Sequence, residues 1–153
     1  MSEAKPILGT NICTQIGILV HDIEKATKEY AEFFGVDVPP IGQTGENRAV
    51  YHGKPTPART LQSFFDIGPN IQIELLSPDE EDSVWRHDLD TYGEGVHHIA
   101  FQVNDTEKCI DLCRKKGWEV TQRGTWPTGQ YTYIDARSTL KVVLELLESG
   151  HFE

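Results

Sequence analysis

The chain has 153 residues and a formal charge of −10 at pH 7. This length suits a single domain with one hydrophobic core, and the acidic balance argues against nucleic acid as a partner. No run reaches the roughly 18 apolar residues of a membrane span, so we expect no membrane partner. The first residues, MSEAKPILGTNIC, lack the apolar stretch of a signal peptide, and we therefore expect a cytoplasmic protein.

The first predicted elements are a strand and a helix. Residues 16–20 are rich in β-branched side chains, which predicts a strand. Asp22 is a natural N-cap, and apolar residues then recur near the helical period until Gly35, which is placed to end the helix. Alternation along the strand turns Gln15 and Gly17 away from the face that this helix should cover.

The rest of the first half contains three strand signals, at residues 48–52, 61–67 and 71–76. A Gly-Lys-Pro-Thr-Pro stretch between the first two signals predicts a turn. The acidic run at residues 79–82 predicts a solvated loop. The second half is expected to hold a helix over about residues 106–116, with strands at residues 99–103, 118–122, 131–135 and 140–147.

The two halves are copies of one unit. Residues 15–35 align with residues 98–118, 83 positions later, and each half ends in the tripeptide Glu-Leu-Leu. The element order βαβββ therefore occurs twice, at about residues 12–80 and 95–150. We predict a single α+β domain over residues 1–153 that is built from two βαβββ modules. The first copy is 12 residues longer, which is most simply a longer hairpin around residues 52–60.

The repeat brings four polar residues into equivalent places. They are Gln15, Glu74, His98 and Glu145. A carboxylate between apolar neighbours in a strand is costly to bury without compensation, and two of them call for a shared cation. One imidazole nitrogen and three oxygens suit a divalent ion such as Zn²⁺, Ni²⁺, Co²⁺ or Mn²⁺. The alternative is a buried histidine in salt bridges; His97 falls on the helix-facing side and is not expected to be a ligand.

These features resemble a known family. The doubled βαβββ plan, the segment GEGVHHIAFQV ending at Val103 and the two Glu-Leu-Leu strand ends resemble the vicinal oxygen chelate superfamily. This group includes glyoxalase I, methylmalonyl-CoA epimerase and bleomycin resistance proteins, and the chain looks most like the epimerases and related bacterial proteins. The resemblance implies that the two modules form curved mixed sheets around a metal-binding cleft and that the protein is a homodimer. It also implies that each half supplies two metal ligands, here Gln15 and Glu74 from the first half, His98 and Glu145 from the second. Glutamine at the first ligand position is known within glyoxalase I enzymes.

The resemblance also implies a reaction. A metal that grips a carbonyl oxygen acidifies the neighbouring carbon, and a ligand carboxylate can then act as a base. We therefore expect an isomerase or lyase that works through a metal-stabilised enolate, with Glu145 and Glu74 as catalytic residues. The leading case is an epimerase of an acyl-CoA similar to methylmalonyl-CoA. The alternatives are a lactoylglutathione lyase of the glyoxalase I type and a non-catalytic protein that binds a small molecule such as an antibiotic.

Two further sets of residues carry predictions. The small-molecule carbonyl substrate is expected to contact Arg48, Arg123, Gln130 and Tyr131, because a loop with a cation and aromatic groups suits closure over an anion. For each of these residues, ordinary surface or core packing is the alternative. The three cysteines are expected to be free thiols, two of them packed in the core.

Overall fold

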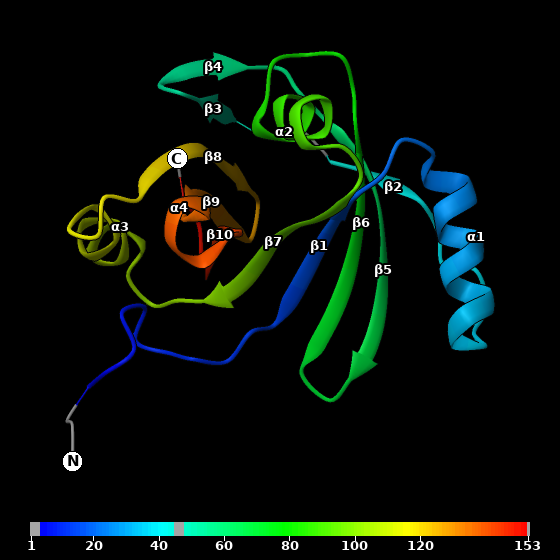
Figure 1. Ribbon diagram of the computed structural model, residues 1–153, viewed down its shortest axis with the longest axis horizontal. Coiled ribbons are helices and arrows are strands. Elements are labelled where there is room, and N and C mark those ends of the chain that lie inside the picture. The colour runs from blue at the N-terminus through cyan, green and yellow to red at the C-terminus, as the bar shows by residue number, and fades with distance from the viewer. Residues whose placement is uncertain (1–3, 45–47, 153) are drawn as a thin grey trace.

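The computed structural model describes residues 4–44 and 48–152, and within them it contains one curled mixed sheet of ten strands with four helices (Figure 1). This confirms the α+β class with two βαβββ modules. No helix in these ranges is long and apolar enough to cross a membrane.

The elements alternate along the chain as the repeat predicts, with one additional hairpin and two additional helices. The first half contains β1 (Gln15–Leu19), β2 (Gly42–Gln43), β3 (Ala49–Tyr51), β4 (Lys54–Thr56), β5 (Thr60–Gly68) and β6 (Ile71–Pro78). The second half contains β7 (Gly95–Gln102), β8 (Glu119–Trp126), β9 (Gly129–Asp135) and β10 (Val143–Ser149). The helices are α1 (Ile23–Phe34), α2 (Val84–Tyr92), α3 (Thr106–Arg114) and α4 (Arg137–Leu140).

The repeat extends to the helix caps. The Asp22 side chain accepts a hydrogen bond from the Lys25 backbone N–H at 3.0 Å, which fixes the start of α1. The Asp105 side chain accepts from the Lys108 backbone N–H at 3.1 Å at the start of α3. Gly35 ends α1 in the left-handed conformation with φ of 67°, as predicted. Both helices therefore begin at the aspartates that the sequence marks.

The first strands of the two copies meet at the centre of the sheet. The strand order is β2-β5-β6-β1-β7-β10-β9-β8-β3-β4. Strands β1 and β7 run antiparallel to each other, and each is flanked by the last strand of its own half in parallel orientation. Helix α1 packs on β5 and β6, and α3 packs on the other half of the sheet (Figure 1). The inner face of the central strands stays free of these helices.

The inserted hairpin, β3–β4, crosses to the opposite half of the molecule. Its strand β3 pairs with β8, where Val50 lies opposite Arg123. His52 and Gly53, with φ of 46° and 78°, form the tip, which is typical of a tight hairpin turn. Of the predicted Gly-Lys-Pro-Thr-Pro turn, Gly53 lies in the turn, but the three residues after it form β4. Pro55 is tolerated there because β4 is the outermost strand.

Helix α2 joins the two halves and was not predicted from the sequence. The Ser83 side chain caps it by accepting from the Arg86 backbone N–H at 3.0 Å. Trp85 and Leu89 are buried in the inner core together with Tyr133. The helix therefore closes one end of the curled sheet, and the acidic run before it is a loop, as predicted.

Candidate metal centre

The four predicted ligands lie on the four central strands. Strands β6, β1, β7 and β10 are neighbours in the sheet, and they carry Glu74, Gln15, His98 and Glu145 respectively. Residues paired across strands present their side chains on the same face. The duplication therefore directs one side chain from each strand toward a common point on the inner face.

Two small residues leave room for these side chains. Gly17 lies between Glu74 and His98 in one row across the sheet. A Cβ atom on Gly17 would lie 2.0 Å from His98 Cε1, so only glycine allows the imidazole to occupy its place. Ala100 takes the equivalent position between the other two ligands, 83 positions along the chain from Gly17.

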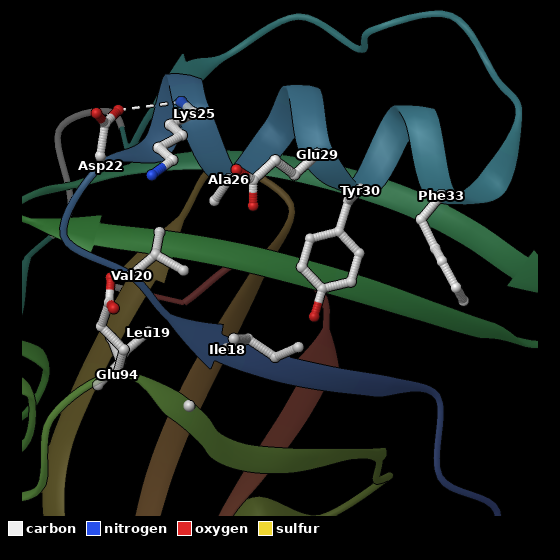
Figure 2. A pocket seen from close by; sticks show the side chains of 11 residues that line it. Ile18, Leu19, Val20, Asp22, Lys25, Ala26, Glu29, Tyr30, Phe33 and Glu94 are labelled. Carbon is white, nitrogen blue, oxygen red and sulfur yellow. Dashed lines mark hydrogen bonds between the residues drawn. The ribbon is translucent and has the colours of Figure 1, made fainter.

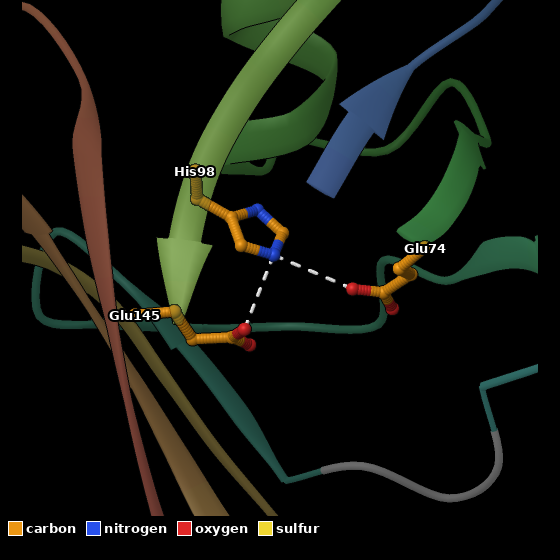
Figure 3. Close-up of side chains that lie close together, drawn as sticks. All are labelled: Glu74, His98 and Glu145. Atoms are coloured by element: carbon orange, nitrogen blue, oxygen red, sulfur yellow. Dashed lines mark ion pairs between the residues drawn. The ribbon is translucent and has the colours of Figure 1, made fainter. Parts of the chain in front are cut away.

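The side-chain tips converge. Glu74, His98 and Glu145 each offer a ligand atom, and these atoms lie within 4.8 Å of one another (Figure 3). His98 Nε2 lies 3.1 Å from Glu145 Oε2 and 3.3 Å from Glu74 Oε2. Gln15 completes the group, because its Oε1 lies 2.9 Å from Glu74 Oε2 and 3.2 Å from Glu145 Oε2. The three ionisable side chains are all buried.

This arrangement fits a divalent cation. His98 Nε2 is buried and has no well-aligned hydrogen-bond partner among the described residues. The Gln15 oxygen faces two carboxylate oxygens, a repulsive contact that either a positive charge between them or a half-turn of the amide would relieve. A cation held by all four atoms would remove both anomalies. It would also offset two buried negative charges, which are costly without compensation.

Burial and charge set the protonation of the cluster. Burial lowers the pKa of His98, but the neighbouring carboxylates of Glu145 and Glu74 outweigh it and raise this pKa to about 10. Burial raises the pKa of Glu74 above its ordinary value, and the close contact with His98 opposes this rise. A proton on His98 therefore offsets part of the negative charge, and a metal ion has to displace it to reach Nε2.

His97, which was not expected to face the centre, lies beside it. The pairing of β7 with β1 slips by one residue at His97, which is therefore the extra residue of a β-bulge. Its Nδ1 lies 3.0 Å from His98 Nδ1, and its Nε2 lies 2.7 Å from Asp88 Oδ2 on α2. The prediction that His97 faces the helix side is wrong, because strict alternation fails at the bulge.

The ligands open into a cavity of about 420 Å³. The Tyr133 ring lies 5.1 Å from the His98 ring, and its hydroxyl accepts a hydrogen bond from Trp85 Nε1 at 3.0 Å. The described residues that line the cavity include no lysine or arginine. Besides Gln15, Glu74 and Glu145, its walls are formed by neutral side chains, namely Gln43, Thr44, Gln62, Phe64, Trp85, Trp126, Tyr131, Tyr133 and Leu147.

Of the four residues predicted to hold the substrate, only Tyr131 lines this cavity. Arg48, Arg123 and Gln130 line a separate hollow of about 870 Å³. There Arg123 donates hydrogen bonds to Glu107 at 2.6 Å and to Gln130 at 3.3 Å. Successive residues of β9 point to opposite faces, which separates Gln130 from Tyr131. The structure does not bring these three residues to the metal centre.

Another hollow, of about 630 Å³, lies under α1 on the opposite face of the sheet (Figure 2). Its walls are mainly apolar and include Ile18 and Tyr30. Two of the three carboxylates that line it are engaged in local structure, since Asp22 caps α1 and Glu94 accepts from the His21 backbone N–H at 2.8 Å. It contains none of the four predicted ligands.

Comparison with solved structures agrees with this architecture. Methylmalonyl-CoA epimerase from Mycobacterium tuberculosis is 20% identical with a TM-score of 0.64, over 97% of this chain and 93% of that chain. A Streptomyces coelicolor methylmalonyl-CoA epimerase variant in complex with 2-nitronate-propionyl-CoA is 24% identical with a TM-score of 0.63, over 93% and 96%. Hypothetical protein BH1468 from Bacillus halodurans is 24% identical with a TM-score of 0.62, over 93% and 96%. The TM-scores show a shared fold, and at these identities the likeness shows the fold alone.

The sequence itself also identifies the family. No curated protein sequence matches this chain. Residues 14–134 match the Glyoxalase/Bleomycin resistance protein/Dioxygenase superfamily, a range that includes Gln15, Glu74 and His98 and ends before Glu145. With the repeated βαβββ unit and the paired central strands, this match establishes that the chain belongs to the Glyoxalase/Bleomycin resistance protein/Dioxygenase superfamily.

Proposed function

We propose that this protein is a divalent-metal-dependent isomerase or lyase that removes a proton from a carbon next to a carbonyl group. The observation that carries the proposal is the convergence of ligand atoms of Glu74, His98 and Glu145 within 4.8 Å, where both glutamates line a cavity. The leading case is an epimerase of an acyl-CoA similar to methylmalonyl-CoA. The likeness to methylmalonyl-CoA epimerases supports this choice.

Four residues would hold the metal: Gln15, Glu74, His98 and Glu145. One nitrogen and three oxygens with two negative charges suit Zn²⁺, Ni²⁺, Co²⁺ or Mn²⁺. When bound, such an ion would stabilise negative charge on the carbonyl oxygen and so make the neighbouring C–H group more acidic.

Glu145 and Glu74 are the candidates for the base, and they reach the centre from different halves of the chain. Glu74 is anchored, because its Oε1 accepts a hydrogen bond from Gln62 Nε2 at 2.7 Å. Glu145 has no comparable anchor among the described residues, which favours it as the group that takes the proton. If one carboxylate takes the proton and the other, itself protonated, delivers its own proton to the opposite face, the carbon centre would be inverted.

The side chains of the cavity walls indicate which parts of a substrate could enter. The rings of Trp126 and Tyr131 stack with centroids 6.5 Å apart, and amide groups provide neutral hydrogen-bonding partners. The described lining has no lysine or arginine, so the phosphates of an acyl-CoA would lie outside the cavity while its acyl group enters.

By family resemblance we expect the active form to be a cytoplasmic homodimer of single-domain chains, with modules at about residues 12–80 and 95–150.

A lyase of the glyoxalase I type is the second candidate, favoured by an amide, Gln15, at the first ligand position. Incubation of the metal-loaded protein in D₂O with 2-substituted acyl-CoAs, hemithioacetals and keto-sugars separates the two by proton NMR. Exchange at the acidic carbon of the acyl-CoAs supports the epimerase, and turnover of hemithioacetals alone supports the lyase. Metal binding without exchange in any of them would favour a non-catalytic binding protein.

A further inference from the structure

We propose that two hydrogen-bond chains, each ending in an aspartate outside the cluster, orient the two uncharged metal ligands so that their free lone pairs face the centre. The inference rests on the proposed metal site and extends it to residues that do not touch the metal. The chains are Asp88–His97–His98 and Asp66–Gln72–Gln15.

The first chain selects the nitrogen that His98 offers. Arg137 donates to Asp88 Oδ2 at 3.1 Å, and this ion pair keeps Asp88 as a carboxylate, which can only accept hydrogen bonds. His97 Nε2, at 2.7 Å from the same oxygen, must therefore carry the proton. A neutral His97 then has a bare Nδ1, which can only accept from His98 Nδ1 at 3.0 Å. Nε2 is thus the His98 nitrogen that remains for a metal.

The second chain works in the same way on an amide. Gln72 Nε2 donates to Asp66 Oδ1 at 3.2 Å, so the Gln72 oxygen points toward Gln15. That oxygen accepts from Gln15 Nε2 at 3.0 Å, which leaves Gln15 Oε1 facing the two glutamates. The three residues are paired in one row across β5, β6 and β1, so the backbone register itself places the chain.

Reversal of the second chain is opposed at its outer end. A Gln15 amide turned by half a rotation would donate to Glu74 at 2.9 Å and to Glu145 at 3.2 Å. Its oxygen would then lie 3.0 Å from the Gln72 oxygen. If Gln72 turned as well, its oxygen would face the Asp66 carboxylate. Each aspartate therefore acts as a fixed acceptor that sets the direction of its chain.

Titration of the metal-free protein with Zn²⁺ and Co²⁺ tests the proposal. In Asp88→Asn and Asp66→Asn an amide replaces the carboxylate and can donate as well as accept, so each chain can reverse. We expect the Kd for Zn²⁺ to rise by about 10–100-fold in Asp88→Asn. We expect a smaller rise, of about threefold to tenfold, in Asp66→Asn because Asp66 is exposed. Asp90→Asn is the matched control, since Asp90 lies on α2 and pairs with Arg86 instead. Unchanged Kd values in both test variants would overturn the proposal.

A second measurement needs neither metal nor substrate. In ¹⁵N-histidine NMR of the metal-free protein, His97 should carry its proton on Nε2 and none on Nδ1, and a proton on Nδ1 would overturn the first chain. If circular dichroism shows that Asp88→Asn does not fold, His97→Phe can be used in its place. This variant keeps an aromatic ring at position 97 but has no nitrogen to accept from His98 Nδ1. It should weaken Zn²⁺ binding, and wild-type affinity would contradict the proposal. If the Zn²⁺ affinities of the variants changed as expected but the wild-type protein showed no deuterium exchange with any substrate, only the proposed function would be contradicted. The proposal on ligand orientation would stand.

Discussion

Gly17 lies directly against the imidazole ring of His98. The two residues are paired across β1 and β7, and a Cβ atom on Gly17 would lie 2.0 Å from His98 Cε1 and 2.3 Å from His98 Nε2. Real Cβ atoms do not approach other heavy atoms so closely. The orientation of a central ligand is therefore fixed by the absence of a side chain on the neighbouring strand.

Gly17→Ala should displace His98 and abolish metal binding. Overpacking at a buried site costs about 1–3 kcal/mol, so the free energy of unfolding should fall by this amount. Zinc titration and urea denaturation measure the two effects. Gly42→Ala is the matched control, because Gly42 also lies in a strand and has no atom within 4 Å of its added Cβ. Wild-type zinc affinity in Gly17→Ala would contradict the packing argument.

Removal of metal should lower thermal stability. A ligand that binds only the folded state stabilises it by about 2.7 kcal/mol at a concentration 100 times its Kd. For a chain of this size that corresponds to a fall in Tm of about 5–10 °C when EDTA is added. Differential scanning calorimetry with and without EDTA measures this shift, and re-addition of Zn²⁺ should restore the Tm. If the protein is purified without metal and its Tm changes with neither EDTA nor Zn²⁺, the proposed metal centre would be ruled out.

Glu145→Gln and Glu74→Gln should each suppress solvent deuterium exchange at the acidic carbon of the substrate. An amide cannot accept the proton, and loss of a general base costs about 10²–10⁴-fold in rate. Proton NMR in D₂O gives the exchange rate of each variant. Glu119→Gln serves as the control, since Glu119 is exposed at the start of β8. Exchange at the wild-type rate in both test variants would rule out a glutamate base.

The three thiols should differ sharply in reactivity. All three cysteines are free, and Cys109 and Cys113 are buried, whereas Cys13 is partly exposed. Burial raises the pKa of Cys113 to about 11 and also raises the pKa of Cys109, so neither forms a thiolate at neutral pH. Iodoacetamide should modify only Cys13 in the native protein and all three in urea, as read by mass spectrometry. Rapid modification of native Cys113 would contradict its burial.

Asp88 should contribute to stability in a defined pH range. Burial raises its pKa, but hydrogen bonds from His97 and His87 and the charge of Arg137 outweigh this and lower it from 3.8 to about 2. A lowered pKa in the folded state stabilises the protein above the unfolded value, and the gain is lost as the pH falls from 3.8 toward 2. Asp88→Asn should therefore lose about 2 kcal/mol at neutral pH. Urea denaturation at several pH values across this range measures the free energy of unfolding. If this free energy changed equally with pH in the variant and the wild type, the prediction would be contradicted.

The convergence of Gln15, Glu74, His98 and Glu145 could be predicted because a duplicated unit places equivalent residues at equivalent points of its strands. The position of His97 could not, because one extra residue in β7 reverses the alternation on which such predictions depend. The sequence also did not indicate which residues of other helices and strands lie next to the metal centre.

Asp88 enters from α2, a helix whose apolar residues are too few to give a clear period. Arg123 was expected at the substrate because of its charge and its loop-like surroundings. It instead lies within a regular strand, β8, and pairs with Glu107, outside the metal cavity. Charge and composition alone do not determine which face of a sheet a residue occupies.

The crossing of hairpin β3–β4 to strand β8 makes each half of the chain depend on the other. A C-terminal fragment that began after α2 would leave β8 with unpaired backbone groups, which promote aggregation. A fragment that ended before β7 would leave β1 unpaired along one side and β3–β4 with no sheet to join. We therefore expect that neither half folds as a separate protein, although both have the same order of helices and strands.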